Sequence, residues 1–381
     1  MGVLTSFPTT DPRTREKWSI DLFEYALKAT LYKALGLVGV TPDAFIHTNK
    51  DLQKGKGDTV GFELTVPPSG AGQGDDGTYD GNTDTFAVHN DSVVVHQRGN
   101  ASQSAGLMSE QRTATDFRPT AKTQLGIWLK EKMEFDMRQA ICGLYNETGI
   151  ATVNESYPSA ARIWYGGQTS AGVIERVAAD ANVDSVTTNL FGSAVISTLR
   201  RMAIDAVPAL RPITLDGKDY FVALIHPLAA KAIKMETNWS AWQKDAALRG
   251  ATNPLFTAAL GIVDGVILVE DARMPYRTGA GSTTPAEGFS LASGLATTND
   301  AVASGITVAR GALMGAQGLL WAWAKSPSWI EAMVDGGTKA RVTTEAIYGV
   351  KRTKFKTAGS VAQQDYGIIN FDCAVVADPT V

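Results

Sequence analysis

The sequence predicts an α+β protein in which one long helix and one projecting β-hairpin accompany a mixed α/β core. Residues 113–147 predict the helix, because their apolar side chains recur at helical spacing. Residues 58–98 predict the hairpin, because two β-branched runs flank an acidic, glycine-rich loop. With 381 residues, 44% hydrophobic and 19% charged, the chain suits a well-packed protein. Its length fits about two to three domains or one large multi-lobed unit.

The N-terminal region, residues 1–57, is expected to form an arm and a helix. Residues 1–17 are polar and contain two prolines, which favours an extended conformation. Apolar residues then follow at helical spacing over residues 18–34, and Gly36 provides a stop signal. The sequence KGKGD at residues 54–58 predicts a tight turn into the hairpin.

The hairpin loop contains a literal G-x-G-x-x-G at Gly72, Gly74 and Gly77, directly after a predicted strand at residues 59–66. A dinucleotide-binding fingerprint requires a helix to begin at the third glycine, so that the helix N-terminus binds the pyrophosphate. The residues after Gly77 contain another glycine and then strand-like alternation. The acids of the loop would also repel a phosphate. We therefore interpret the motif as a hairpin tip and expect no bound cofactor.

The hairpin is strongly acidic. Between Gly57 and Gln97 there is no Lys or Arg, but there are seven acids: Asp58, Glu63, Asp75, Asp76, Asp80, Asp84 and Asp91. The loop oxygens could hold calcium, although the loop lacks the ligand spacing and the terminal Glu of an EF-hand, so calcium stays a minor alternative. A loop of this length is uncommon in a compact domain unless it is functional or reaches a partner.

The long helix is expected to begin near Pro119 and to stop at residues 146–149. Its apolar side chains cover much of the helix surface, which indicates contacts on more than one side. At 1.5 Å per residue it would span about 40–50 Å and act as a strut. Residues 150–189 are rich in Ser, Gly, Asn and Thr and are expected to be irregular.

The middle of the chain has an α/β texture, and the last part is expected to be β. The predicted elements are a helix over 192–206, a buried strand over 219–227 that Pro227 ends, a short helix after it, a short helix joined to a buried strand over 253–271, and a strand followed by a helix-like run over 306–324. Strands are predicted from residue 338 onward.

The sequence predicts no catalytic, cofactor-binding or metal-binding residues, and hence not an enzyme. Cys142 and Cys373 both lie among apolar residues and form no disulfide or zinc pattern. The four histidines form no H-E-x-x-H motif, and neither a G-x-S-x-G elbow nor a Walker loop is present. His226 ends a buried strand and is interpreted as structural. Trp239 and Trp242 are three residues apart and are interpreted as one buried helical face.

The net charge of −4 and the pI near 5.7 argue against a protein whose main task is to grip nucleic acid. The sequence shows no signal-peptide pattern and no run of about 18 apolar residues, so no membrane association is expected. The two unpaired cysteines are compatible with folding in a reducing cytoplasm.

Taken in order, several short motifs resemble the major capsid proteins of tailed phages of the N-four type. They are KGKGDTVGFEL before the acidic hairpin, the run from Gln111-Arg112 to Asp116-Phe117-Arg118 into the long helix, the strand ending in His226-Pro227, NPLFTAALG with GVILVE, and DYG near the C-terminus. The resemblance covers about residues 15–372 and implies the Hong-Kong-97-like capsid fold.

The resemblance implies that this chain has five regions. They are an N-terminal arm and helix (1–57), an extended loop that lies over a neighbouring subunit (58–98), a peripheral domain with the spine helix 113–147 (99–189), an axial domain at the capsomer centre (190–325), and C-terminal strands that return to the peripheral domain (326–381).

The function implied is that of the major capsid protein of a tailed double-stranded DNA phage. Copies of the chain would assemble through pentameric and hexameric capsomers into an icosahedral shell, inside the cytoplasm of the host bacterium. The implied partners are other copies of the chain, a scaffolding protein, a portal protein, in some cases a decoration protein, and packaged DNA bound without sequence specificity on the inner face. We expect a separate scaffolding protein because the chain begins close to the arm.

Within this resemblance, the acidic hairpin is expected to dock on a basic surface of a neighbouring subunit. The expected loop contacts are Asp75, Asp76, Asp80 and Asp84. The expected basic dock is the one dense cluster of cations in the chain, Lys351, Arg352, Lys354 and Lys356. The family archetype cross-links its extended loop through a lysine, and this loop has none, so that chemistry is expected to be absent here.

Two other functions are compatible with parts of the sequence. A shell protein of an encapsulin-like nanocompartment would share the fold, and would be distinguished by protein rather than DNA inside the particle. A nucleotide-dependent enzyme would use the glycine loop, and would be distinguished by cofactor binding.

Overall fold

The computed structural model describes residues 31–53, 55–66, 72–75, 77–80, 83, 87–112, 117–143, 158–168, 174–176, 183, 190–215, 217–236, 259–278, 307–355 and 364–375. The helix expected over residues 18–34 lies outside these ranges except for its last turn, which is helix α2 (Leu31–Ala34).

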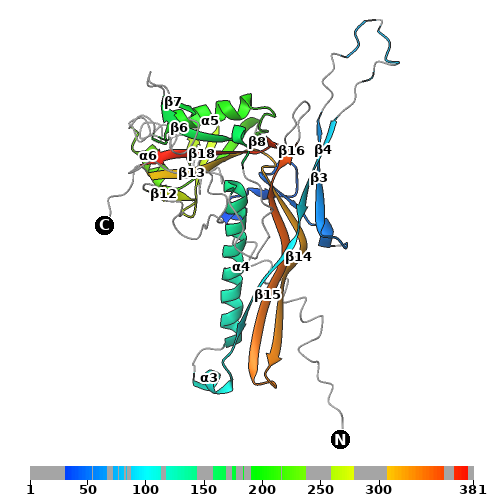
Figure 1. The fold of residues 1–381 in the computed structure, drawn as a ribbon, viewed down its shortest axis with the longest axis vertical. Helices are drawn as coiled ribbons and strands as arrows, with labels where there is room; N and C mark the ends of the chain where they lie inside the picture. Colours follow the sequence, from blue (N-terminus) through cyan, green and yellow to red (C-terminus); the bar gives the residue numbers. More distant parts are fainter. Residues whose placement is uncertain are drawn as a thin grey trace.

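The molecule is elongated. Helix α4 (Phe117–Cys142) runs along its long axis beside the two long strands β14 (Leu319–Val334) and β15 (Lys339–Arg352) (Figure 1). A larger mixed sheet lies at one end of α4. The hairpin of β3 (Thr59–Val66) and β4 (Ala87–Val94) projects at the same end (Figure 1).

A five-stranded sheet follows the long axis, in the order β1-β2-β14-β15-β5. Its shorter strands are β1 (Val38–Gly39), β2 (Ile46–Asn49) and β5 (His96–Gln103). β14 and β15 are antiparallel, and the turn between them uses positive φ angles of 55° at Asp335, 65° at Gly336 and 88° at Gly337. Burial alternates along much of β15, as expected for a strand with one face on the core and one toward solvent.

Helix α4 packs against β15 and β5 and reaches β13 of the second sheet. Along its C-terminal half, from Met133 to Cys142, nearly every side chain is buried. The helix therefore has contacts on more than one side, as its wide apolar surface predicts. The core around it is formed by side chains from both sheets, among them Leu129, Met133, Met137, Trp321, Trp323, Tyr348, Leu224 and Met314.

The second sheet has nine strands, in the order β10-β11-β9-β13-β18-β6-β7, with β8 beside β9 and β12 beside β13. The strands are β6 (Ile163–Gln168), β7 (Ile174–Arg176), β8 (Ile213–Leu215), β9 (Lys218–Ile225), β10 (Ala259–Val263), β11 (Val266–Glu270), β12 (Tyr276–Thr278), β13 (Thr307–Met314) and β18 (Ile368–Val375). Every residue of β13 and β18 is buried. Such continuous burial is expected of central strands that are covered on both faces.

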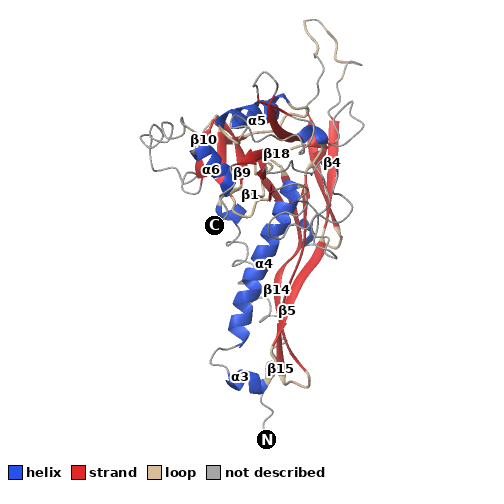
Figure 2. Cartoon of the chain, turned by 60° about the vertical axis from the view of Figure 1, so that its left-hand side comes forward, coloured by secondary structure: helices blue, strands red, loops and turns tan. Residues whose placement is uncertain are grey.

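Helices α5 (Ser193–Asp205) and α6 (Pro227–Lys234) lie beside this sheet (Figure 2). Their apolar faces, led by Leu199 and Ile233, form one core with side chains of β9, β11, β13 and β18. The residues of β9 that point to the other face of the sheet, Val222 and Leu224, enter the core around α4 instead. The sheet therefore separates two cores and joins the helical layer to the long axis of the molecule.

Smaller elements complete the described chain: η1 (Asp51–Gln53), α3 (Leu107–Arg112), η2 (Ala160–Arg162), β16 (Lys354–Phe355) and β17 (Gln364–Asp365). Among the helices described, none is long and apolar enough to cross a membrane.

Several sequence predictions are confirmed. The helix expected over 192–206 is α5, and the hairpin expected over 58–98 is the β3–β4 pair. The sequence predicts the second arm of the hairpin around residues 92–98, but this arm ends at Val94, and residues 96–98 belong to β5, which pairs with β15. The strand ended by Pro227 is β9, with α6 starting at the proline itself. α4 covers the described part of the predicted long helix, whose outer residues 113–116 and 144–147 lie outside the described ranges.

The helix-like run predicted after the strand at residue 306 is wrong. Residues 319–324 begin the long strand β14, whose first five residues are buried. A strand covered on both faces is continuously apolar, so its sequence cannot be told from a buried helix by periodicity alone. Over residues 253–271 the sequence predicts a short helix joined to a buried strand. The described part of that helix is wrong, because residues 259–263 are strand β10. β10 pairs with β11 across an Asp264-Gly265 turn with φ angles of 48° and 74°.

Two expected region boundaries do not coincide with the sheets. β14 crosses the boundary at 325, and it pairs with β15 and β2, not with the strands of the second sheet. Conversely, β6 comes from the stretch expected to be irregular, and β18 comes from the C-terminal region. The two pair with each other in the nine-stranded sheet. Strand pairing between distant segments decides this division, and sequence order does not show it.

Candidate functional site

The β3–β4 hairpin is an eight-residue antiparallel pair in continuous register, from Thr59 opposite Val94 to Val66 opposite Ala87. Its described tip residues, 72–75 and 77–80, are all exposed. Residues 77–80 are irregular, so no helix N-terminus begins at Gly77. The Gly77 amide instead donates to the Gly74 carbonyl in a turn at 3.0 Å. This geometry differs from that of a phosphate-binding glycine loop.

The structure places two of the four predicted loop contacts. Asp75 and Asp80 are exposed on the tip, while Asp76 and Asp84 lie outside the described residues. Asp75 has a φ of 47°, a left-handed conformation that Asp tolerates in turns. The side chain of Tyr79 is also exposed, by 71%. The tip therefore presents carboxylates together with an exposed aromatic ring.

The root of the hairpin is seated on the five-stranded sheet. Val60, Phe62 and Val93 form a small core with Leu320 and Ala322 at the start of β14. The ring of Phe62 meets His47 of β2 edge-on, with ring centroids 5.4 Å apart.

A glycine permits the close approach of β4 to β15. A Cβ atom at Gly349 would clash with the Val94 carbonyl oxygen. The root is thus fixed to the body by packing on both of its strands.

Asp91 links the hairpin to the end of β15. Its buried carboxylate accepts a hydrogen bond and ion pair from the Lys351 ammonium, and one from the Lys354 amide at 2.9 Å. The Lys351 ammonium also donates to the Ser92 carbonyl at 3.0 Å. Asp91 is therefore a charged hub between β4 and the β15–β16 corner.

The predicted basic dock is only partly a surface feature. Arg352 is 0% exposed, so its inclusion in an exposed dock is wrong. Its guanidinium lies 3.3 Å from Asp365 and donates to the Ile141 carbonyl at 3.0 Å. Lys351 is paired with Asp91, Lys354 lies 3.9 Å from Asp365, and Lys356 lies outside the described residues. The structure does bring an acid of the hairpin to this cluster, but at the root and within one chain.

A second set of buried charges fixes α4 to both sheets. Asp136 of α4 accepts two hydrogen bonds from Arg98 of β5, at 2.7 and 2.9 Å, and one from the Tyr348 hydroxyl of β15 at 2.6 Å. Arg138 of α4 lies 3.2 Å from Asp271, which follows β11. Both pairs are almost fully buried, so each charged side chain needs its partner to offset the cost of losing its hydration.

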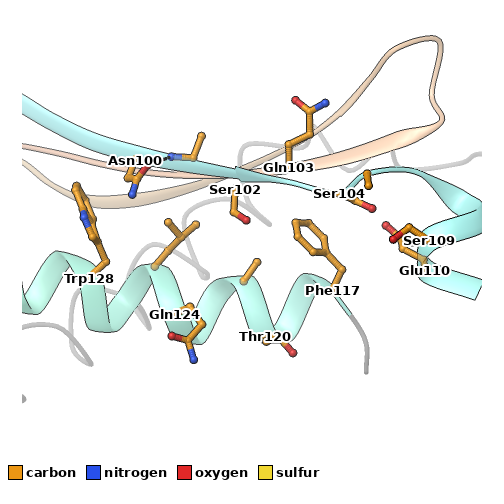
Figure 3. A pocket seen from close by; sticks show the side chains of 14 residues that line it. Asn100, Ser102, Gln103, Ser104, Ser109, Glu110, Phe117, Thr120, Gln124 and Trp128 are labelled. Atoms are coloured by element: carbon orange, nitrogen blue, oxygen red, sulfur yellow. Dashed lines mark hydrogen bonds between the residues drawn. The ribbon is translucent and has the colours of Figure 1, made fainter. Parts of the chain in front are cut away.

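At the far end of α4, a cavity of 590 Å³ opens between α4, β5 and α3. Figure 3 shows Phe117 and Trp128 rising from α4 toward β5, with Ser109 and Glu110 of α3 at one end. Leu107 and Met108 of the same short helix are 61% and 66% exposed. Exposed large apolar side chains beside a cavity indicate a contact surface. Sequence reasoning missed this groove, because its walls come from three separate segments.

The titratable residues singled out in the sequence have structural roles here. His226 caps α6, since its Nδ1 accepts from the Leu228 amide at 3.1 Å. Burial lowers the pKa of His226, and nearby Asp271 opposes that shift. Burial raises the pKa of the Cys142 thiol to about 12, which keeps it protonated and unreactive. Within the described ranges, no group of three or more His, Cys, Asp or Glu side chains is placed to hold a metal ion.

Comparisons with known proteins agree with one another. The family described as phage capsid protein matches residues 6–377. The major capsid protein of Pseudomonas phage KPP25 is 23% identical over 398 residues, which cover 97% of each chain. The capsid of Ralstonia phage GP4 has a similar fold, with a TM-score of 0.72 and 22% identity over 93% of each chain. The capsid of cyanophage Pam1 follows, with a TM-score of 0.67 and 22% identity over 90% of this chain and 92% of that one.

Proposed function

This chain belongs to the phage capsid protein family, and on that premise we propose that it is the major capsid protein of a tailed double-stranded DNA phage. Copies of it would assemble through pentameric and hexameric capsomers into the icosahedral shell of the virion. The observation that carries this proposal is the extent of the family match, residues 6–377, which includes both sheets, α4 and the hairpin. The likeness therefore involves the whole architecture and not one shared module.

The finer architecture that supports this function is of the Hong-Kong-97 type. In this proposal α4 is the spine helix, and the five-stranded sheet with α4 forms the peripheral domain. The nine-stranded sheet with α5 and α6 forms the axial domain at the capsomer centre, including β6 and β18. Residues 1–57 would form the N-terminal arm region.

The hairpin at residues 58–98 would be the extended loop that lies over a neighbouring subunit. Its seated root and exposed tip suit that role, because the tip is held away from its own chain. We expect Asp75, Asp76, Asp80 and Asp84 to contact a basic surface of the neighbour. Of the predicted dock, Lys356 stays a candidate for that contact. A cross-link through a loop lysine is not expected, since residues 58–96 contain none.

Other partners follow from the role of a shell subunit. We expect a scaffolding protein during assembly in the bacterial cytoplasm, a portal protein at one vertex and, in some cases, a decoration protein outside. DNA would contact the inner face without sequence-specific binding, as the net charge of −4 suggests. The chain would need no cofactor and catalyse no reaction. A nanocompartment shell is less favoured, because the relatives named above are phage proteins.

Expression of the chain alone, followed by negative-stain electron microscopy and light scattering, tests the proposal. Rings, tubes or closed shells are the expected products, with the coexpressed scaffolding protein added if the chain alone stays monomeric. A protein that stays monomeric with scaffold, with crowding agents and across a range of salt would contradict it. Extraction of the contents separates the alternatives, since DNA indicates a capsid and a protein cargo a nanocompartment.

A further inference from the structure

Five arginine side chains are buried in the described part of the chain: Arg98, Arg138, Arg162, Arg310 and Arg352. Four of them form an ion pair with a carboxylate, at 2.7 Å for Arg98 and Asp136, 3.2 Å for Arg138 and Asp271, 2.6 Å for Arg310 and Asp372, and 3.3 Å for Arg352 and Asp365. Arg162 is 1% exposed and forms no such pair among the described residues. A buried guanidinium without a counter-charge is costly, and it requires an explanation.

The hydrogen bonds of Arg162 are also incomplete. Its Nη2 donates to the Pro208 carbonyl, while Nε and Nη1 are covered and have no acceptor. Burial lowers the pKa of Arg162, and the charge of Asp365 opposes that shift. That carboxylate is already shared by Arg352 at 3.3 Å, Lys354 at 3.9 Å and the Ser159 amide at 2.8 Å. Among the described residues, one buried carboxylate thus serves three cations, so this cluster has more positive than negative charge.

A cavity of 260 Å³ lies beside Arg162. Arg201 of α5 and Gln364 of β17 line it and can donate hydrogen bonds, and Asp205 is the one acid among the described residues of its wall. Arg201 is exposed and forms no ion pair with another residue that the structure describes. A water molecule occupies about 30 Å³ of liquid, so the cavity has room for an ion with several oxygens and its waters.

Two exposed apolar side chains lie at this cavity or close to it. Val207 lines the cavity and is 76% exposed, and Ile204 on the last turn of α5 is 54% exposed. Arginine with apolar neighbours is a composition enriched at protein interfaces. The ion that enters the cavity can therefore be free in solution or be carried by a protein surface that covers the rim.

We propose that this cavity is an oxyanion-binding site in which Arg162 and Arg201 together bind a phosphate or a carboxylate. Because Nε and Nη1 of Arg162 are covered, the guanidinium turns toward the cavity when the anion binds. Charge-assisted hydrogen bonds from two guanidinium groups are among the strongest that proteins make, which offsets the repulsion from Asp205. The bound anion gives Arg162 a counter-charge. The other four buried arginines receive theirs from carboxylates of the same chain.

Two sources can deliver this chemistry. One is inorganic phosphate, and the other is an Asp or Glu side chain of a second copy of this chain, which rests on the proposed function. The two arms of the experiment separate these sources. The first arm uses the unassembled protein, so it does not depend on whether a shell forms.

In the first arm, the full-length unassembled protein is titrated with inorganic phosphate at constant ionic strength, and binding is followed by calorimetry and by Tm. Free-phosphate binding predicts a saturable rise in Tm that R162M abolishes. R201Q changes an exposed residue, so it should fold normally and weaken the affinity by at least about tenfold, as expected for a charged hydrogen-bond donor. R112Q is the matched control, because it removes the same charge from exposed α3 and should leave the affinity unchanged.

In the second arm, the assembled particle is heated with and without phosphate. A neighbour's carboxylate in the cavity predicts that R162M and R201Q lower the temperature of particle dissociation, and that phosphate has no effect on the wild-type particle. The control for this arm is K218Q, which removes one positive charge at an exposed residue of β9 and should leave the dissociation temperature unchanged. If no particle forms, the proposed function fails and the first arm alone decides the site.

The proposal is overturned if the unassembled protein shows no saturable phosphate response and the three variants have equal effects on the particle. It is also overturned if R162M and R112Q reduce phosphate affinity equally, since binding would then follow net charge. R162M tests the burial argument separately. In chloride buffer it should be no less stable than the wild type, because it removes an uncompensated buried charge.

Discussion

Asp91 shows how a single side chain can fix the direction of a whole hairpin. Three donors converge on its carboxylate: the Lys351 ammonium, the Lys354 amide and the Ser92 amide at 2.8 Å. Two of these belong to the β15–β16 corner, so the hub holds β4 to the body. The sequence predicts a contact between acids of the hairpin tip and the basic cluster of a neighbouring subunit. The contact of Asp91 is a different one, between residues 260 positions apart in the same chain.

We expect D91A to loosen the hairpin root without unfolding the body. The loss should be about 1–3 kcal/mol, since the Lys354 amide and the Lys351 ammonium lose a charged acceptor. Hydrogen exchange should rise in β3 and β4 and stay unchanged in β13 and β18. E63A, which removes an exposed acid from the same strand pair, is the control and should change stability by less than about 0.5 kcal/mol. Equal exchange in the two variants would show that Asp91 does not hold the root.

His226 should give the protein a measurable pH dependence. Its neutral Nδ1 caps α6, and burial lowers its folded-state pKa below the ordinary value of 6.5. Because the folded state favours the neutral imidazole of His226, its contribution to the free energy of unfolding is complete above pH 6.5. The contribution is lost as the pH falls from 6.5 toward the folded-state pKa.

The variant H226N separates the cap from the titration, because Asn is a good N-cap that does not titrate. Wild-type Tm should fall relative to H226N as the pH drops below 6.5, because the folded-state pKa of His226 is lowered. H226A should cost about 0.5–2 kcal/mol at neutral pH. A Tm difference between wild type and H226N that does not vary with pH would rule out this titration.

At the scale of elements, α4 is held by buried charges as well as by apolar packing. Asp136 connects the helix to β5 through Arg98 and to β15 through Tyr348. The C-terminal half of α4 is buried on nearly all sides, so it has no single apolar face that would set the rotation of the helix about its axis. The directional contacts of Asp136 therefore fix which side of α4 faces each strand.

Removal of either partner should be strongly destabilising. R98M or D136L alone should cost about 3–5 kcal/mol, because each leaves an uncompensated charge in the core. The double variant should lose less than the sum, which a double-mutant cycle from urea unfolding measures. The exposed pair of Arg273 and Glu131, 3.1 Å apart, is the control, and R273Q should cost about 0–1 kcal/mol. Additive effects of R98M and D136L would show that the pair acts independently.

The sequence predicts elements well where a single periodicity dominates. α5 has one apolar face and well-placed ends, and its predicted bounds differ from the structure by one residue at each end. The same reasoning fails for β14. Its first residues, LLWAWA, are buried on both faces of the strand, so they show no alternation of apolar and polar residues. Trp321 and Trp323 alternate as strand residues do, with ring centroids 4.9 Å apart, and that alternation was the available signal.

The candidate site is harder to predict than the elements. The exposed acids of the tip are visible in the sequence, because a run without cations needs no structure to be recognised. The burial of Arg352 is not visible in the sequence, since its partners Asp365 and Asn370 look like ordinary polar residues of a C-terminal strand. Charge clusters in a sequence therefore indicate composition, whereas the fold decides which charges reach the surface.

At the scale of the whole molecule, the exposed features lie at opposite ends. The acidic tip extends beyond the nine-stranded sheet, and the groove with α3 lies at the other end of α4 (Figure 1). A shell subunit needs several separate contact surfaces to close a lattice, and an elongated shape separates them.

Replacement of Leu107 and Met108 should impair assembly but not folding. Both side chains are exposed, so L107Q/M108Q should unfold at the wild-type temperature within about 2 °C. If α3 is an assembly contact, negative-stain images should show few closed particles at protein concentrations where the wild type assembles. V40Q, an exposed apolar residue near β1, is the control. Normal particles from L107Q/M108Q would remove α3 from the contact surfaces.

Charge reversal at the hairpin tip tests the docking of the loop. D75K/D80K should raise the concentration needed for assembly by up to about fivefold per contact, since exposed ion pairs contribute about 0–1 kcal/mol each. The effect should shrink as salt increases. E270K reverses an exposed charge at the end of β11 and serves as the control. An unchanged concentration for D75K/D80K would contradict a basic docking surface.

The seated hairpin root has a mechanical consequence. β15 has 14 residues, about 45 Å of extended chain, and its C-terminal end meets the hairpin at Asp91. Its other end lies beside the N-terminal half of α4, near the groove. The hairpin is thus one arm of a lever, Asp91 is its fulcrum, and β15 is the other arm. A load that bends the tip at one neighbour would reach the opposite end of the subunit through a single strand.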